Sequence, residues 1–173
     1  MTKFFFSGVV ALLLSSAAAH AQTATAAKIG HLSAQALLAA LPESATAEVE
    51  LTAFTKSWQS QYDGLNTRYT ALIKDYQLNA KTLADTAKAA RSARAEALQL
   101  QLQSVKQNAQ AAIDKKRLEL YQPLNQKAQA AINAVAEAKG YDYVVDDTTG
   151  LFLYVRKSTN NLLPAAKAKL GVK

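Results

Sequence analysis

The sequence of 173 residues contains no cysteine, only six glycines and three prolines, and few aromatic residues: one Trp, seven Tyr and five Phe. Without cysteine, disulfide frameworks, thiolate zinc sites and cysteine nucleophiles are excluded. Between Pro42 and Gly140 there is one further glycine and one further proline, so this region lacks the loops on which most enzymes carry their sites. Half of the chain is hydrophobic, but 36 residues are alanine, which fills little core volume and favours helix.

The N-terminus has the three parts of a secretory signal peptide. Lys3 is followed by the apolar run Phe4 to Leu14, and Ala19-His20-Ala21 places small residues where a signal peptidase cleaves. The alternative, a membrane anchor, needs roughly 20 apolar residues. We therefore expect residues 1–21 to be removed after Ala21 and the mature chain to act outside the cytoplasm. The mature chain keeps 19 Lys and Arg against 13 Asp and Glu, a net charge of +6, which attracts acidic partners; export argues against nucleic acid.

Two heptad-spaced seams predict a long antiparallel helical hairpin. Spacings of 4, 3, 4, 3 and 4 in the first seam, and of 4, 3, 4 and 3 before the last pair of the second, follow a period of 3.5, which is typical of a coiled coil. The first seam lapses near Leu78 to Thr86, where we expect the chain to reverse. Consecutive helices joined by a short connection pack antiparallel. The first seam comprises Trp58, Tyr62, Leu65, Tyr69, Leu72 and Tyr76, and the second comprises Leu98, Leu102, Val105, Ala109, Ala112 and Ile113.

Both ends of the mature chain predict short strands and helices. A strand at 28–32 precedes a helix at 34–41, which Ser33 can cap and Pro42 ends. The returning helix passes Pro123, which should kink it, and ends at Gly140. Strands are expected at 141–146 and 151–155 around a turn at 147–150, followed by a helix at 162–170. Both faces of the last strand are apolar, so a small sheet of this kind needs other copies to complete a core.

These features together resemble the Skp (OmpH-like) family of periplasmic chaperones. The most specific matches are Pro123-Leu124, Ala131-Ile132, Val135-Ala136 and the run Gly140-Tyr-Asp-Tyr-Val-Val-Asp146. Asn161 stands where many members carry Asp, and either side chain can cap a helix. The resemblance implies an α+β fold, a helical hairpin arm on a small β body that closes into a barrel by trimerisation. It also implies an ATP-independent holdase that keeps unfolded outer-membrane β-barrel proteins in a cavity between its arms.

On this reading the chain divides into a signal peptide (1–21), a body that mediates oligomerisation (22–42 and 123–173) and an arm (43–122). Candidate client-binding residues are the aromatic residues of the first helix: Phe54, Trp58, Tyr62, Tyr69 and Tyr76. Tyrosine suits a site that is apolar on one side and wet on the other. The competing interpretation, which we favour for the rings, is that they fill the seam between the two helices. Phe54 lies one position off the seam and is either exposed for binding or buried against the body.

A basic cluster marks the expected arm tip, formed by Lys81, Lys88, Arg91 and Arg94. It would attract acidic chains, an anionic membrane surface or lipopolysaccharide phosphates, or it simply solubilises the tip. The run Lys115-Lys116-Arg117 is expected on a solvated face.

Catalysis and cofactor binding have no support in the sequence. His31 is expected to be packed in the core, the Asp residues at 142, 146 and 147 lack the spacing of a calcium loop, and neither a catalytic cluster nor a phosphate loop is visible. We therefore predict a protein that is not an enzyme and needs no cofactor or metal. The alternative to a chaperone is a structural coiled-coil protein or envelope tether without chaperone activity.

Overall fold

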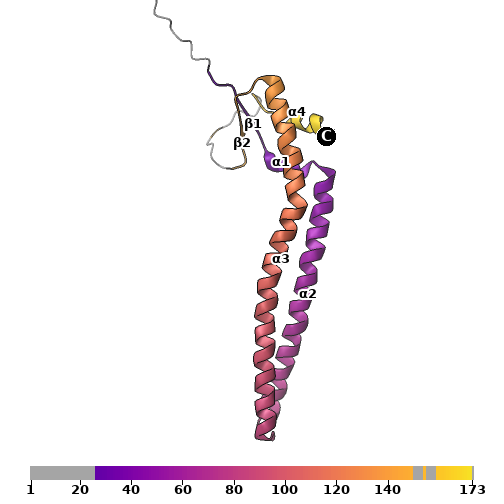
Figure 1. The fold of residues 1–173 in the computed structure, drawn as a ribbon, viewed down its shortest axis with the longest axis vertical. Coiled ribbons are helices and arrows are strands. Elements are labelled where there is room, and N and C mark those ends of the chain that lie inside the picture. Colours follow the sequence, from indigo (N-terminus) through magenta and orange to yellow (C-terminus); the bar gives the residue numbers. More distant parts are fainter. Residues whose placement is uncertain (1–25, 150–153, 155–158, 173) are drawn as a thin grey trace, which may run out of the picture.

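The computed structural model describes residues 26–149, 154 and 159–172. It shows a long two-helix arm that projects from a small body of strands and short helices (Figure 1). The predicted signal peptide and the predicted strand at 151–155 lie outside the described residues, apart from Tyr154. The elements in chain order are β1 (Ile29–Leu32), α1 (Ala34–Ala39), α2 (Pro42–Asn79), α3 (Asp85–Lys139), β2 (Tyr143–Asp146) and α4 (Leu163–Leu170).

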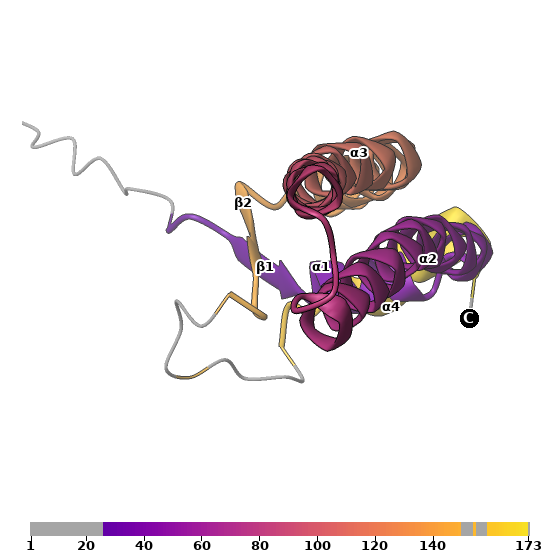
Figure 2. The ribbon, with the colours of Figure 1, turned by 90° about the horizontal axis from the view of Figure 1, so that it is seen from below.

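The predicted hairpin is confirmed as α2 and α3, which lie side by side along the arm (Figures 1 and 2). α2 has 38 residues and is therefore roughly 57 Å long at 1.5 Å per residue. Every residue of both predicted seams is half-buried while most neighbours are exposed. The seams therefore face each other, and little apolar surface is fully buried along the arm.

The chain reverses within the predicted region. α2 ends at Asn79, and the amides of Thr82 and Leu83 donate to the Asn79 carbonyl at 2.9 and 3.1 Å. The Thr82 hydroxyl donates to the same carbonyl. Asp85 opens α3 and places a carboxylate in its first turn, where the helix dipole favours negative charge.

The body contains a parallel pair of strands that are far apart in the sequence. β1 pairs with β2 in the register Ile29 to Tyr143 and Leu32 to Asp146. On the other edge of β1, the segment before α4 adds a third strand-like contact: the His31 amide donates to the Asn160 carbonyl at 3.0 Å, and the Leu162 amide to the His31 carbonyl at 2.9 Å. The whole arm is thus inserted between two paired strands.

The short helices are positioned by caps. The Ser33 hydroxyl accepts from the Ala36 amide at 3.0 Å, which confirms the predicted N-cap of α1. Pro42 does not only end the first helical segment; it is also the first residue of α2, a position where proline loses no helical hydrogen bond. At the start of α4 the N-cap is Leu162, which makes no side-chain cap bond; instead the preceding Asn161 side chain accepts from the Leu163 amide at 2.9 Å.

α3 carries the arm into the body. It continues through Pro123 as one helix and ends at Gly140, whose φ of 63° is the left-handed conformation of a C-cap. Its last turns pack on α1, α4 and the strands. Three clusters form this core, centred on Leu32, Val135 and Leu162, on Leu37, Ala128 and Ala166, and on Leu41, Ala47 and Leu124.

Among the described helices, none is long and apolar enough to span a bilayer.

Candidate functional site

The five aromatic residues singled out from the sequence all lie on α2 and are half-buried. Each ring is in part covered and in part open to solvent. Phe54 packs edge-to-face against Trp58 with ring centroids 6.5 Å apart, so it continues the row of aromatic residues along the arm. Phe54 is neither fully exposed nor buried in the body. The heptad spacing continued back from Trp58 would put Thr55 in the seam, but Thr55 is exposed and Phe54 takes that place instead.

Two of these residues open into a groove between the helices, which we call the arm groove. Its volume is about 290 Å³. α2 contributes Trp58 and Tyr62, and α3 contributes aliphatic side chains. An aromatic wall therefore faces an aliphatic wall at mid-arm. The full lining is Thr55, Trp58, Gln59, Tyr62, Val105, Lys106, Ala109, Gln110 and Ile113. Tyr69 and Tyr76 lie nearer the tip and do not line it.

The sequence predicted only half of this groove. The heptad spacing places Val105, Ala109 and Ile113 in the seam between the helices, and it gives Lys106 no role. Their place opposite Trp58 follows from the antiparallel pairing, because residues whose numbers sum to about 167 face each other in this hairpin, as Trp58 and Ala109 do in the groove. That sum could have identified the opposite wall.

At the arm base, polar bonds join α2 to α3. Lys127 binds Glu43 and Lys116 binds Glu50, each with Nζ 2.5 Å from the carboxylate oxygen. The hydrogen bond from Lys127 holds the pKa of Glu43 below its ordinary value, and the bond to Glu50 raises the pKa of Lys116. The expectation that the run at 115–117 only faces solvent is therefore wrong for Lys116, whose side chain is 24% exposed.

The third bond at the arm base involves a tyrosine. The Tyr121 hydroxyl donates to Glu48 at 2.7 Å. This hydrogen bond, together with burial and the charge of Glu48, raises the pKa of the phenol. Glu43, Glu48 and Glu50, predicted only as favourable residues near a helix N-terminus, thus also tie the two helices together.

The predicted basic cluster does lie at the arm tip, but half of its charge is paired. Arg91 binds Asp75 through Nε and Nη2 at 3.0 and 2.9 Å. Lys88 binds Asp85 at 3.2 Å. Lys81 and Arg94 have no ion-pair partner among the described residues.

In the body, His31 is 6% exposed, as predicted for a packed residue. Its partners were not predicted: Nδ1 lies 2.8 Å from an Asp147 carboxylate oxygen, and Nε2 lies 3.0 Å from the Thr159 carbonyl oxygen. The histidine therefore joins β1 to the segments that follow β2 and precede α4. The described residues contain no cluster of three or more His, Asp or Glu side chains that could hold a metal ion.

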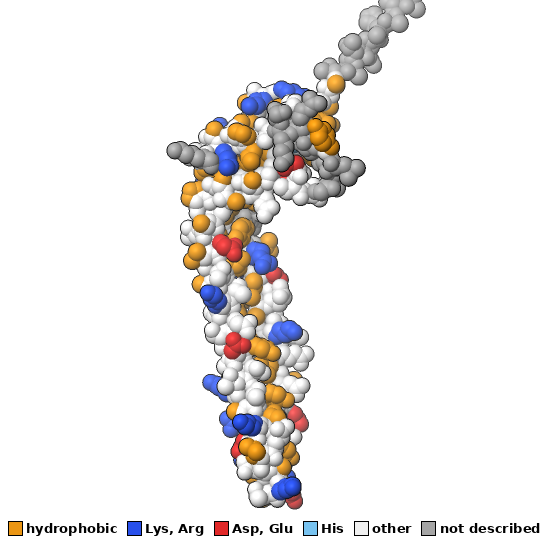
Figure 3. All heavy atoms as spheres, turned by 180° about the vertical axis from the view of Figure 1, so that it is seen from behind, with side chains coloured by type: hydrophobic (Ala, Val, Ile, Leu, Met, Phe, Trp, Pro, Cys, Tyr) orange, Lys and Arg blue, Asp and Glu red, His pale blue; other side chains and the backbone are white. Residues whose placement is uncertain are grey.

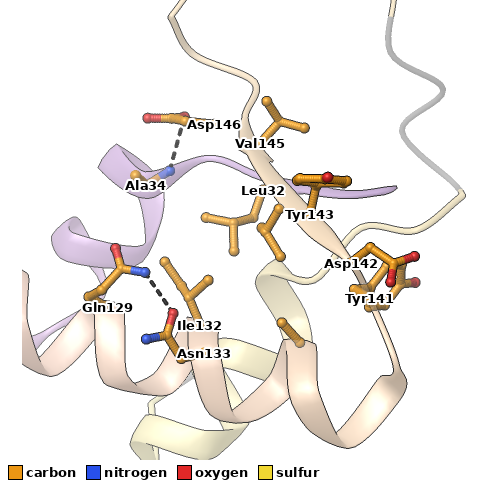
Figure 4. A pocket seen from close by; sticks show the side chains of 12 residues that line it. Leu32, Ala34, Gln129, Ile132, Asn133, Tyr141, Asp142, Tyr143, Val145 and Asp146 are labelled. Carbon is orange, nitrogen blue, oxygen red and sulfur yellow. Dashed lines mark hydrogen bonds between the residues drawn. The ribbon is translucent and has the colours of Figure 1, made fainter. Parts of the chain in front are cut away.

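A second groove of about 430 Å³ lies between the sheet and the end of α3. Leu32 and Ile132 face each other across it, while Asp146 reaches over to the first turn of α1 and accepts from the Ala34 amide (Figure 4). Burial raises the pKa of Asp146, but hydrogen bonds from Thr148 and Ala34 outweigh burial and lower it overall. The carboxylate is thus committed to a structural role.

Comparisons with known proteins agree on the type of chain. The family model described as "Outer membrane protein (OmpH-like)" matches residues 28–170. A crystal structure from Caulobacter crescentus CB15, described as that of a candidate OmpH-like outer membrane chaperone, superposes with a TM-score of 0.66, covering 96% of this chain and 90% of that one at 14% identity. That level of identity supports the fold alone. No curated protein shows significant sequence similarity.

Proposed function

The chain belongs to the OmpH-like outer membrane protein family, and from that membership we propose that it is an ATP-independent periplasmic chaperone. It holds unfolded outer-membrane β-barrel proteins and prevents their aggregation. The observation that carries the proposal is the family match along the arm and body together, combined with an arm whose apolar side chains remain half-open to solvent. An arm built only as a coiled-coil spacer would bury its seam more completely.

The proposed assembly is a trimer whose bodies share one core. Ile29 and Tyr143 are register partners on neighbouring strands, and they are 51% and 64% exposed. Adjacent exposed apolar side chains on a two-stranded sheet favour association with further copies. On this proposal, residues 22–42 and 123–173 form the oligomerising body, residues 43–122 form the arm, and the cavity between three arms holds the client.

Weak contacts spread over long arms explain holding without ATP. Along the arm, hydrophobic side chains reach the surface in small groups separated by charged and polar ones (Figure 3). Each group binds an apolar segment weakly, and many such contacts together retain the client. Release then requires no nucleotide, because folding into the membrane competes with contacts that break one at a time.

We also propose that the arm tip contacts an anionic membrane surface or lipopolysaccharide. Lys81 and Arg94, the tip cations without an ion-pair partner in the described part of the chain, would attract phosphates, and that attraction would be screened within a Debye length of about 8 Å at physiological ionic strength.

The test is suppression of aggregation. An outer-membrane barrel protein is denatured in urea and diluted at low salt into the mature chain, while light scattering and complex mass are recorded. We expect scattering to fall at a few-fold excess of trimer and a complex of one client with three copies to form. Unchanged scattering would refute the holdase and favour the tether, whereas a monomeric mass at micromolar concentration would refute the shared body.

A further inference from the structure

The arm groove has a composition that distinguishes it from the rest of the arm. Between Glu96 and Asp114, α3 carries a single charged residue, Lys106, and that residue lines the groove. Elsewhere the arm presents charged and polar side chains at close intervals. The groove therefore combines aromatic and aliphatic walls with neutral polar residues, and Lys106 is the one charged residue of its lining.

The walls of the groove suit a flat ring. Trp58 is steadied by the edge-to-face contact with Phe54, and Tyr62 lies one turn further along the same wall. The opposite wall is made of the β-branched side chains of Val105 and Ile113, with Ala109 between them leaving space. A volume of about 290 Å³ accommodates an aromatic side chain, and an aromatic pair packs best edge-to-face or offset.

The two glutamine amides that line the groove are already engaged. Gln59 donates to Asp63 at 2.8 Å, and Gln110 donates to Asp114 at 2.8 Å. Asp114 also accepts from Arg117 at 3.2 Å. By contrast, Lys106 has no carboxylate within ion-pair distance among the described residues. Its ammonium is thus the cationic group of the groove lining, and it can bind a ligand of opposite charge.

Building on the proposed function, we infer that the arm groove is a binding subsite for an aromatic side chain next to a carboxylate in an unfolded client chain. The ring enters between Trp58 and the aliphatic wall, and the neighbouring carboxylate binds Lys106. The subsite gives the chaperone a preference for client segments that carry an aromatic residue next to an acidic one, whereas the rest of the arm surface binds without such selectivity.

The chain contains one tryptophan, Trp58, so its emission reports on the groove without labels. The probe is a capped heptapeptide, Gly-Ser-Phe-Asp-Phe-Ser-Gly, titrated into the full mature chain at low salt. Two matched peptides replace Asp with Asn or both Phe with Ala. We expect saturable changes in Trp58 emission, roughly two- to fivefold weaker binding without the carboxylate, and at least about tenfold weaker binding without the rings.

Variants locate the site. Lys106→Gln should abolish the difference between the Asp and Asn peptides, while Lys115→Gln, the same change at a lysine outside the groove, should preserve it. Ala109→Leu should fill the groove and weaken all binding, while Ala111→Leu on the exposed face should not. Helical content and oligomer mass check that each variant folds, and Lys106→Gln needs no change of packing.

The outcomes separate the two proposals. If the wild-type chain suppresses aggregation but Trp58 emission does not respond to the peptide, or if Lys115→Gln has the same effect as Lys106→Gln, the subsite is refuted and the holdase stands. Emission that changes with protein concentration while the measured oligomer mass stays constant would show that a further copy occupies the groove, which also overturns the subsite. If suppression of aggregation fails in the wild type, the proposed function is refuted.

Discussion

Gly30→Ala should destabilise the body, although alanine is normally the safer residue. The φ of Gly30 lies outside the left-handed region, where only Gly140 and Gly171 are found among the described glycines, so its backbone does not require glycine. The surrounding side chains do require glycine, because a Cβ at this position would lie 2.4 Å from Cδ1 of Leu162 and 3.2 Å from Cδ1 of Tyr141. Leu162 is 1% exposed and has little room to move.

The magnitude follows from two opposed effects. An ordinary van der Waals contact needs at least 3.4 Å, so Leu162 must move by about 1 Å, and overpacking of this kind costs about 1–3 kcal/mol. Alanine also lowers the conformational entropy of the unfolded chain, which stabilises the folded state by about 0.4–1 kcal/mol. We expect a net loss of about 1–2 kcal/mol, or a decrease in Tm of about 2–8 °C for a chain of this size.

The assay is denaturation at fixed protomer concentration, because association contributes to stability, with hydrogen exchange at Ile29–Leu32 as the local readout. Gly64→Ala is the matched control: nothing lies within 4 Å of a Cβ at this position on α2, so the variant should gain about 0.5–1 kcal/mol in helix stability. Leu162→Val removes the clashing Cδ1 and should relieve the penalty. Equal stability of Gly30→Ala and wild type, or a penalty that Leu162→Val leaves unchanged, would refute the reasoning.

Two further predictions concern charges. The pKa of Asp146 is lowered because hydrogen bonds from Thr148 and from the Ala34 amide outweigh burial. The ionised carboxylate therefore stabilises the fold above the pKa of an unfolded Asp, about 3.9. This stabilisation is lost as the pH falls through the pKa of Asp146 in the folded protein. Urea denaturation between about pH 5 and 2 should show a larger loss in wild type than in Asp146→Asn, which keeps the loss from groups such as Glu43; equal losses would contradict the prediction. At the tip, Arg91→Gln should lower the free energy of local opening at the turn by about 0.2–1 kcal/mol, because Asp75 loses its partner. Arg94→Gln is the control and should leave that free energy unchanged. Hydrogen exchange around the turn measures the difference, and equal protection in both variants would contradict the prediction.

The arm was predictable because its determinants are local. Heptad spacing, the scarcity of glycine and proline, and the Gly140 cap each act within a few residues, and the structure confirms them. The Ser33 cap of α1 in the body is local in the same way. The pairing of β1 with β2 is different: Ile29 and Tyr143 are 114 residues apart, and a parallel partner leaves no mark on a four-residue strand. The hydrogen bond between His31 and Asp147 was missed for the same reason, since it depends on that pairing.

The limit of local reasoning is clearest in the charged residues. Lys116, Arg91 and Lys106 lie on the same predicted helix, and the sequence does not show which of them has an acidic partner on the other helix. The structure gives the first two acidic partners on α2 and places Lys106 beside the arm groove without one. The register between the helices determines which cations hold the arm together and which have no acidic partner among the described residues. Since one register sets both the ion pairs and the groove, a change that shifted it by a single heptad would remove the subsite even if every side chain named here were kept.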